Sequence, residues 1–574
     1  MKTTLTSRKS NQTGSALMLT MIMSAIALAL LAGAMSWSAS STRLTYRSIQ
    51  YNRSVAAAEA ATEKVESQIN QDFLKGGESL VIKNLNTYRQ NTVPSSSDSS
   101  YWGTWVFDDA NGNTGQTYVQ RSPGTSYVVL DSTYAGLKGF ASTYTIASHA
   151  RDTASPQDVT AGVLQQLQLT SIPIFQFAMY SSGEMEISCG QPFDITGRVH
   201  SNGELYVEPD SSLTFESSVT AVINILFQRD PLDTRGPPAG SVLYVHPNQK
   251  VAPVAALTLP IGTTNTPQAI REIIEPPPAG EDPASPIGRL RYYNQCDLLV
   301  VASDTGVRAT SGHVNNVSTN DLNMFVSTAN SFWDAREGKT VKPIDLNIGK
   351  LTSWSLTNSG LRSSLIGSNL TSVYVDDRRT LPATSLGAVR VVNGPKLPPT
   401  GLTVATGRPL YVQGDYNELN LANLGTANTS TTLPASLVGD AITILSDAWQ
   451  DKNSGSGVAP AGAASTTVNA AILTGAVETT LGHYSGGMEN FPRFLENWGS
   501  ANVFTYNGSM IKMFPSLYAT NVWGKANVYS PPKRNWAYDA NFDNLSKLPP
   551  KTPSLLKVNR GQWANVPPGQ NVAP

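Results

Sequence analysis

The chain has 574 residues, a formal net charge of -1 and only 14% charged residues. Single folded cores rarely grow beyond about 300 residues, so a chain of this length predicts two or three folded units. A nearly neutral and weakly charged chain has no basic surface to gather nucleic acid, which excludes that class of partner.

The first hundred residues predict one long hydrophobic helix. Lys2, Arg8 and Lys9 precede an uncharged run over residues 10–42, whose most apolar part is residues 16–37. At about 1.5 Å per residue, this part matches the hydrocarbon thickness of a bilayer, so a single membrane span is expected. Small residues along it would allow another helix to approach closely: Ala25, Ala27, Ala29, Ala32, Gly33 and Ala34.

Basic residues flank both ends of this span, because Arg43, Arg47 and Arg53 follow it, so the positive-inside rule does not decide its orientation. The short leader and the large polar C-terminal mass favour a cytoplasmic N-terminus. The bulk of the chain is then expected on the other side of the membrane.

The helical pattern continues beyond the span as an amphipathic stretch. Residues at alternating spacings of four and three fall on one helix face: Tyr51, Val55, Ala58, Thr62, Val65 and Ile69. Gly76-Gly77 then predicts the end of the helix. The expected helix therefore covers residues 15–76, after a leader of residues 1–14.

This N-terminus resembles that of PilX-type minor pilins and related pseudopilins. The resemblance rests on a polar leader ending in Gly14, on Ser15-Ala16-Leu17 opening the apolar run, and on the stretch AAAEAATE at residues 56–63. It implies cleavage between Gly14 and Ser15 by a prepilin peptidase, and packing of the helix against other pilin-like subunits. It also implies a bacterial inner-membrane location, with the bulk of the chain in the periplasm or outside the cell, where it can belong to a surface filament. Leu19 stands at the fifth mature position, where major pilins carry Glu, so the resemblance implies a minor component. The alternatives are a plain signal anchor and a signal peptide cleaved near residues 38–40.

Beyond the helix the chain is expected to be mainly β. Short β-type runs alternate with turns through about residue 169, which predicts a small α+β region with an antiparallel sheet over residues 77–171. Residues 172–574 carry strand fragments too short to be stable alone, so they are expected to stack as a large β-helix-like domain or, alternatively, a sandwich. No fixed repeat length is apparent. Four segments are similar to the large C-terminal regions attached to PilX-like N-termini, and no activity follows from that likeness: residues 332–346, 401–417, 484–498 and 531–539.

The sequence holds no motif typical of nucleophilic, nucleotide-dependent or zinc-dependent catalysis, so no enzyme activity, cofactor or metal is predicted. His200 lies beside a turn and is expected to hydrogen-bond it. Asp109 and Asp539 begin stretches with alternating oxygen side chains, for which Asx turns are favoured over calcium loops. Glu489 and Glu496 lie in an aromatic-rich segment and are the carboxylate pair to compare with glycosidases. Five aromatic residues could form a sugar-binding platform, a core or a lid: Trp523, Tyr529, Trp536, Tyr538 and Trp563.

Cys189 and Cys296 are the only two cysteines. In an exported domain they can form one disulfide, and the alternative is two buried thiols. The function expected from all these features is a non-enzymatic minor pilin-like component of a type IV pilus or a type II secretion-like filament. The alternatives are a membrane-anchored adhesin that binds surface carbohydrate and a β-helical enzyme acting on polysaccharide.

Overall fold

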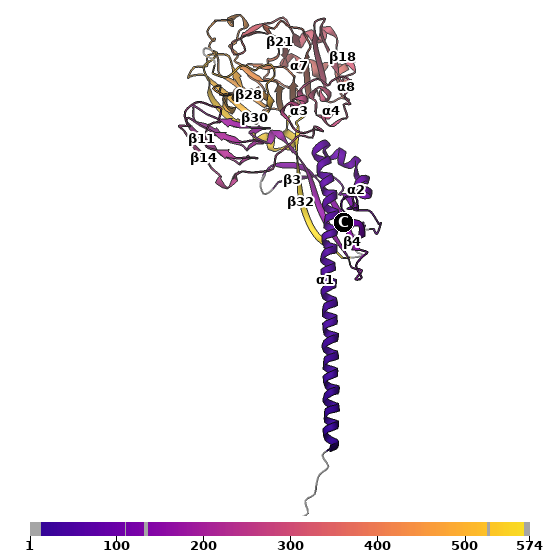
Figure 1. Cartoon of the computed structure of the whole chain (residues 1–574). Helices are drawn as coiled ribbons and strands as arrows, with labels where there is room; N and C mark the ends of the chain where they lie inside the picture. The colour runs from indigo at the N-terminus through magenta and orange to yellow at the C-terminus, as the bar shows by residue number, and fades with distance from the viewer. Residues whose placement is uncertain (1–12, 110, 131–135, 525–527, 568–574) are drawn as a thin grey trace, which may run out of the picture.

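The computed structural model describes residues 13–109, 111–130, 136–524 and 528–567. Helix α1 (Thr13–Lys83) projects from one side of a β-rich body, and its N-terminal end lies farthest from that body (Figure 1). At about 1.5 Å per residue, the continuous part of this helix, residues 13–75, spans roughly 95 Å. The helical path breaks at Gly76 and Gly77, where Gly77 has φ 67°, and the turns then resume to Lys83. The predicted end of the long helix is therefore correct: neither glycine has helical backbone angles, and the turns up to Lys83 form a second, short helix beyond the kink.

The second half of α1 packs on a six-stranded antiparallel sheet. This sheet contains β1 (Trp105–Asp108), β2 (Tyr118–Arg121), β3 (Ser126–Val129), β4 (Lys138–Asp152), β5 (Thr160–Pro173) and β32 (Ser554–Val566), with α2 (Leu85–Asn91) and the 3-10 helix η1 (Ser100–Thr104) beside it. Val65, Ile69 and Phe73 of α1 are buried against Tyr144 and Leu167. The predicted helix face is thus a packing face, although Tyr51 at its start is exposed.

Strand β32 differs from the sequence prediction. It lies antiparallel to β5, from Ser554 opposite Pro173 to Val566 opposite Gly162. The structure therefore places the last strand of the predicted 172–574 domain in the small sheet. Residues 174–553 form a head that leaves the small sheet after β5 and returns to it at β32, on the side away from the free end of α1 (Figure 1).

The head begins with coils of parallel strands on three sides. The first side holds β6 (Met179–Ser181), β9 (Val199–Ser201), β12 (Val219–Ala221) and β15 (Lys250–Val251). The second holds β7 (Met185–Ile187), β10 (Leu205–Val207) and β13 (Ile225–Leu226), and the third holds β8 (Phe193–Ile195), β11 (Ser212–Phe215) and β14 (Ser241–Tyr244). Met179, Val199 and Val219 are in register, as are Met185, Leu205 and Ile225, so one coil takes twenty residues. The sequence does not show this repeat clearly, because the insertion before β14 interrupts it after two periods.

The rest of the head winds between two sheets. One side holds β16 (Leu298–Ser303), β22 (Ser372–Asp377), β24 (Leu402–Ala405), β26 (Ala435–Gly439), β28 (Thr466–Ala476) and β30 (Val503–Pro515). The other holds β21 (Lys339–Asn347), β23 (Ser385–Val392), β25 (Leu410–Gln413), β27 (Ile442–Leu445) and β29 (Arg493–Phe494). These ladders are parallel, which makes the head β-helix-like and not a sandwich.

Shorter elements close the ends and edges of these sheets. The strands are β17 (Gly306–Ser311), β18 (Asn315–Asn316), β19 (Val326–Ser327), β20 (Phe332–Asp334) and β31 (Lys533–Tyr538). The helices are α3 (Pro267–Arg271), α4 (Pro286–Leu290), α5 (Tyr292–Gln295), α6 (Thr319–Phe325), α7 (Ile348–Thr357) and α8 (Ser359–Ser364).

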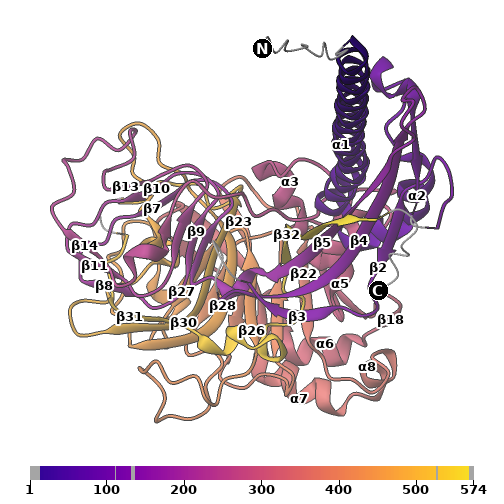
Figure 2. The ribbon, with the colours of Figure 1, turned by 90° about the horizontal axis from the view of Figure 1, so that it is seen from below.

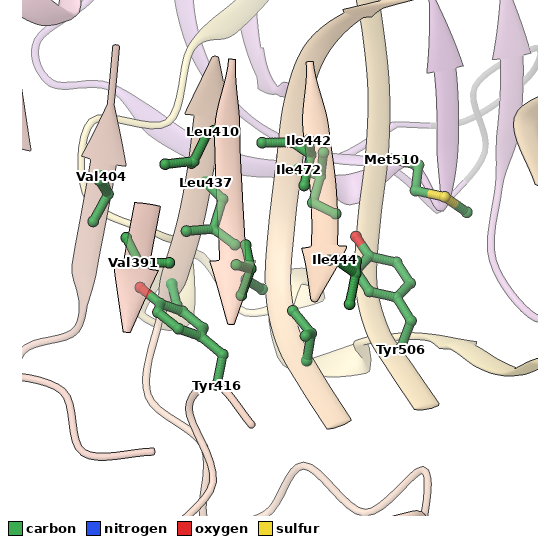
Figure 3. Packing of buried hydrophobic residues seen from close by; sticks show 14 of the residues in the cluster. Val391, Val404, Leu410, Tyr416, Leu437, Ile442, Ile444, Ile472, Tyr506 and Met510 are labelled. Atoms are coloured by element: carbon green, nitrogen blue, oxygen red, sulfur yellow. The ribbon is translucent and has the colours of Figure 1, made fainter. Parts of the chain in front are cut away.

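The order of strands in the largest sheet shows how the two parts join. The chain enters at β6, coils outward to β15, crosses to β16 and coils back to β30, which pairs with β6 through Met510 and Met179. One continuous hydrophobic core therefore runs through both parts. Figure 3 shows Val404, Leu437 and Ile472 of one sheet facing Leu410 and Ile442 of the other.

The inner stack of the three-sided coils generates a stability prediction. Leu205 is fully buried between Met185 and Ile225, so replacing it by Ala should lower the free energy of unfolding by about 3 kcal/mol. Chemical denaturation of the full chain in detergent would measure this change. Leu243→Ala is the matched control, because Leu243 is 58% exposed on β14 and should change stability by less than about 0.5 kcal/mol. Equal effects of the two substitutions would contradict the assignment of the inner stack.

Candidate functional site

The first half of α1 is an apolar surface that the rest of the chain does not cover. Every described side chain from Ser15 to Ile49 is exposed, and the large apolar ones include Leu17, Ile22, Leu30 and Trp37. Within the described residues, α1 is the one helix long and apolar enough to cross a membrane, with a mean hydropathy of 2.3 in its most apolar window. Exposing an apolar surface of this length to water is unfavourable in free energy. Lipid or another protein surface would therefore stabilise this segment by covering it.

The proposed processing site lies at the start of this helix. Thr13 begins α1, so Gly14 and Ser15 belong to its first turn. The first twelve residues of the predicted leader lie outside the described part of the chain. Leu19 is 63% exposed, like its apolar neighbours.

A groove lies where α1 joins the small sheet. Tyr46, Gln50 and Arg53 of α1 line it together with Trp105 and Asp152. The Nε2 of Gln50 and the Nε1 of Trp105 are buried and lack an acceptor among the described residues. Arg53 lies 3.6 Å from Asp152, so the groove also contains an ion pair. Two unsatisfied donors at one edge are costly in an isolated chain, unless water or a partner supplies acceptors.

The two cysteines do not form the bridge that the sequence allowed. Both are free and buried. Cys189 follows β7 in the core of the three-sided coils, whereas Cys296 precedes β16 in a second hydrophobic cluster. The chain brings them to different cores, so the alternative of two buried thiols is correct.

His200 has the structural role that its position beside a turn predicts. Its Nδ1 lies 2.8 Å from Oγ1 of Thr220, and its Nε2 lies 3.0 Å from Oδ1 of Asn202. The ring stacks on Tyr180 and is fully buried. Burial lowers the pKa of His200 to about 4.

The turns at Asp109 and Asp539 have the hydrogen bonds of Asx turns, which the sequence favours there over calcium loops. Asp109 accepts hydrogen bonds from the backbone nitrogens of Asn111 and Asn113, and Asp539 accepts one from Asn541. These are Asx turns. No group of three or more His, Cys, Asp or Glu residues that could hold a metal ion occurs among the described residues.

The carboxylates compared with glycosidases are engaged in structural contacts. Glu489 accepts hydrogen bonds from the backbone nitrogen of Ser188 and the hydroxyl of Tyr484, and Glu496 accepts two from Ser446. Burial raises the pKa of both groups. Both are almost completely buried, which leaves no open face for a sugar between them.

The five aromatic residues do not form one platform. Trp536 packs in the main core against Phe504. The Nε1 of Trp523 donates to the hydroxyl of Tyr529, which packs on Phe494. Trp563 lies exposed on β32, in the small sheet. Tyr538 contacts Phe542. Most of these five aromatic residues therefore pack in or beside the core.

The buried thiols generate a chemical prediction. Burial raises the pKa of Cys189 and of Cys296 to about 12, so thiolate is scarce at neutral pH and neither sulfur is open to reagents. Iodoacetamide should label neither cysteine in the native chain, and both after denaturation without a reductant. A denatured chain that takes up label only after reduction would contradict the two free thiols.

The depressed pKa of His200 predicts a pH dependence. Between about pH 6.5 and 4 the unfolded chain binds a proton at this residue and the folded chain does not, so stability falls as the pH falls. The loss should approach about 3 kcal/mol near pH 4 and then level off. Urea denaturation across this range would measure it, and His200→Gln should flatten the slope. His246→Gln is the control, because His246 is exposed. An unchanged slope in His200→Gln would refute the assignment.

No family model matches this sequence, and no curated protein matches it. Among solved structures, the chain is similar to the crystal structure of the competence-associated pilin ComZ from Thermus thermophilus. The two share 10% identity over 90% of this chain and 98% of that one, with a TM-score of 0.28. A likeness at this level establishes neither the fold nor the function of this chain.

Proposed function

We propose that this chain is a minor pilin-like subunit, held in the membrane and then in a filament by α1, with its β-helix-like head displayed outside the cell. One observation carries this proposal: α1 is divided into a fully exposed apolar half and a half packed on an antiparallel sheet. The packed half fixes the exposed half as a rigid extension of the body. A helix that serves only as a membrane anchor can be joined flexibly to its exported domain. A helix that packs against other subunits in a filament needs a rigid connection, because that connection sets the position of the body relative to its neighbours.

The shape of the chain favours a low-copy or tip position. The head lies to one side of the α1 axis when viewed along the helix (Figure 2). It is also attached at the end of the sheet away from the exposed half of α1 (Figure 1). Helices packed closely in a thin filament would bring such heads into collision, whereas one copy at a tip has free space.

The groove beside α1 is a second surface that supports assembly. Its two unsatisfied donors, on Gln50 and Trp105, lie beside the point where the exposed helix begins. Both donors are buried, so a neighbouring pilin-like subunit would instead contact the exposed lining of the groove, Tyr46 and Arg53. The remaining parts of the proposal are processing by a prepilin peptidase between Gly14 and Ser15, a bacterial inner-membrane location with a cytoplasmic N-terminus, and a carbohydrate ligand as the alternative adhesin role.

The assembly role can be tested at Gly33 in the exposed helix. A Cβ at Gly33 meets no atom within 4 Å, and Leu is a better helix former than Gly, so Gly33→Leu should leave the chain folded. Ala25, Ala29 and Gly33 recur every four residues, which is the spacing that lets two helices approach closely. We expect Gly33→Leu to reach the membrane normally but to be lost from sheared surface filaments, as measured by immunoblotting.

Met35→Leu is the matched control, because it lies on the opposite helix face and conserves volume. Mass spectrometry of the mature chain completes the test, with Ser15 expected as its first residue. A leader left intact, together with normal membrane insertion of both variants and no filament association of the wild type, would favour a plain membrane anchor.

A further inference from the structure

A small basic pocket lies where the three-sided coils meet the two-sided coils. Its volume is about 40 Å³. Its wall includes Arg336 from the turn after β20, Arg493 of β29, Lys512 of β30 and Glu186 of β7. Strand β7 belongs to the first coil of the head, and β29 and β30 belong to the last coils, so residues far apart in sequence form this wall.

Arg336 is the unusual member of this group. Only 6% of the residue is exposed, and its Nε donates to the carbonyl of Asn521 at 3.2 Å. Within the described residues, neither Nη nitrogen has a hydrogen-bond acceptor or an ion-pair partner. A buried guanidinium normally satisfies its whole donor fork.

The nearest acidic groups are occupied elsewhere. Asp334 accepts hydrogen bonds from the hydroxyl of Tyr411 and the backbone nitrogen of Glu337. Glu337 pairs with Arg493 and accepts from the backbone of residues 520 and 521. These carboxylates offset part of the positive charge, but they do not bind the end of the Arg336 side chain.

The turn that carries Arg336 is held firmly. The Nδ2 of Asn521 donates to the carbonyl oxygens of Arg336 and Glu337, each at 2.9 Å. Gly338 closes the turn by donating to the carbonyl of Asp334. The guanidinium is therefore positioned before any ligand arrives, which lowers the entropy lost on binding.

The remaining charges leave the pocket basic. Lys512 donates to the carbonyl of Glu184 and lies 3.8 Å from the exposed Glu478. Glu186 accepts a hydrogen bond from Thr479 at 2.8 Å, and burial raises its pKa to about 7. Burial and the neighbouring Arg493 lower the pKa of Arg336 to about 9, so it remains a cation at neutral pH.

We propose that this pocket binds one oxyanion group, a carboxylate, sulfate or phosphate, through the Nη nitrogens of Arg336, with Lys512 as a second cation in the same wall. The volume holds about three water molecules, which suits one such group and excludes a whole sugar ring. The group comes either from a free ion or from an acidic substituent of a saccharide whose ring stays outside. This inference does not depend on the pilin-like function proposed above.

Titration calorimetry of the full chain in detergent tests the site, with inorganic phosphate, sulfate, acetate and glucuronate as separate probes and glucose as the neutral comparison. At least one anion should bind saturably, and Arg336→Gln should weaken that binding by about tenfold or more. Binding of glucuronate more tightly than acetate would assign the saccharide source, and the reverse would assign a free ion.

Two further variants keep the test decisive. Lys512→Gln should also weaken binding, and it serves if Arg336→Gln fails to fold. Arg308→Gln is the control, because Arg308 is exposed on β17 away from the pocket and should bind as the wild type does. No saturable binding of any anion, or wild-type affinity in both Arg336→Gln and Lys512→Gln, would overturn the proposal.

Discussion

Strand β32 pairs with β5 along almost its whole length, and this ladder holds the two ends of the head together. Pro173 ends β5 and Ser554 begins β32, and the two residues lie opposite each other in the sheet. The head is therefore an insertion with both attachments at one place. Each attachment is tied to a strand that packs under α1, so the head is fixed to the helix by two connections and not by one flexible linker.

The same strand also contacts the helix directly. Leu556 of β32 belongs to the cluster formed with Val65 and Ile69 of α1. The Nε of Arg560 donates to Glu66 at 2.7 Å. Force applied to the head would thus reach α1 through a sheet and its core.

The core of the β-helix-like head consists of short stacked strands. The shortness of these strands limits where functional side chains can lie. A strand of three or four residues has few side chains that point away from the core. Most side chains that are free to bind a ligand therefore lie in the turns between the strands. Arg336 follows this pattern, because it lies in the turn between β20 and β21 and points into a pocket made by distant coils. His200, Glu489 and Glu496 are buried polar groups that hold coils together, and each is satisfied by neighbouring turns or strands.

The local sequence was sufficient for features that depend on neighbours along the chain. The apolar run of α1, its packing face, the break at Gly76-Gly77 and the Asx turns at Asp109 and Asp539 all follow from spacing and from backbone preference. The long helix followed by mainly β structure was predicted for the same reason.

Strand pairing, the separation of the two cysteines, the register of the coils and the surroundings of Arg336 were decided by tertiary structure alone. Each of these features depends on contacts between residues far apart in sequence. A strand such as β32 carries no sign of which edge it will join, and Cys189 and Cys296 carry none of the distance between them. The twenty-residue coil is visible in the sequence only as Ser181-Ser-Gly-Glu184 followed by Ser201-Asn-Gly-Glu204, too brief a repeat to recognise without the ladder that sets its register. That the end of Arg336 has no partner among the described residues is likewise a property of its surroundings, since only the folded chain shows that Asp334 and Glu337 are already bonded to other groups.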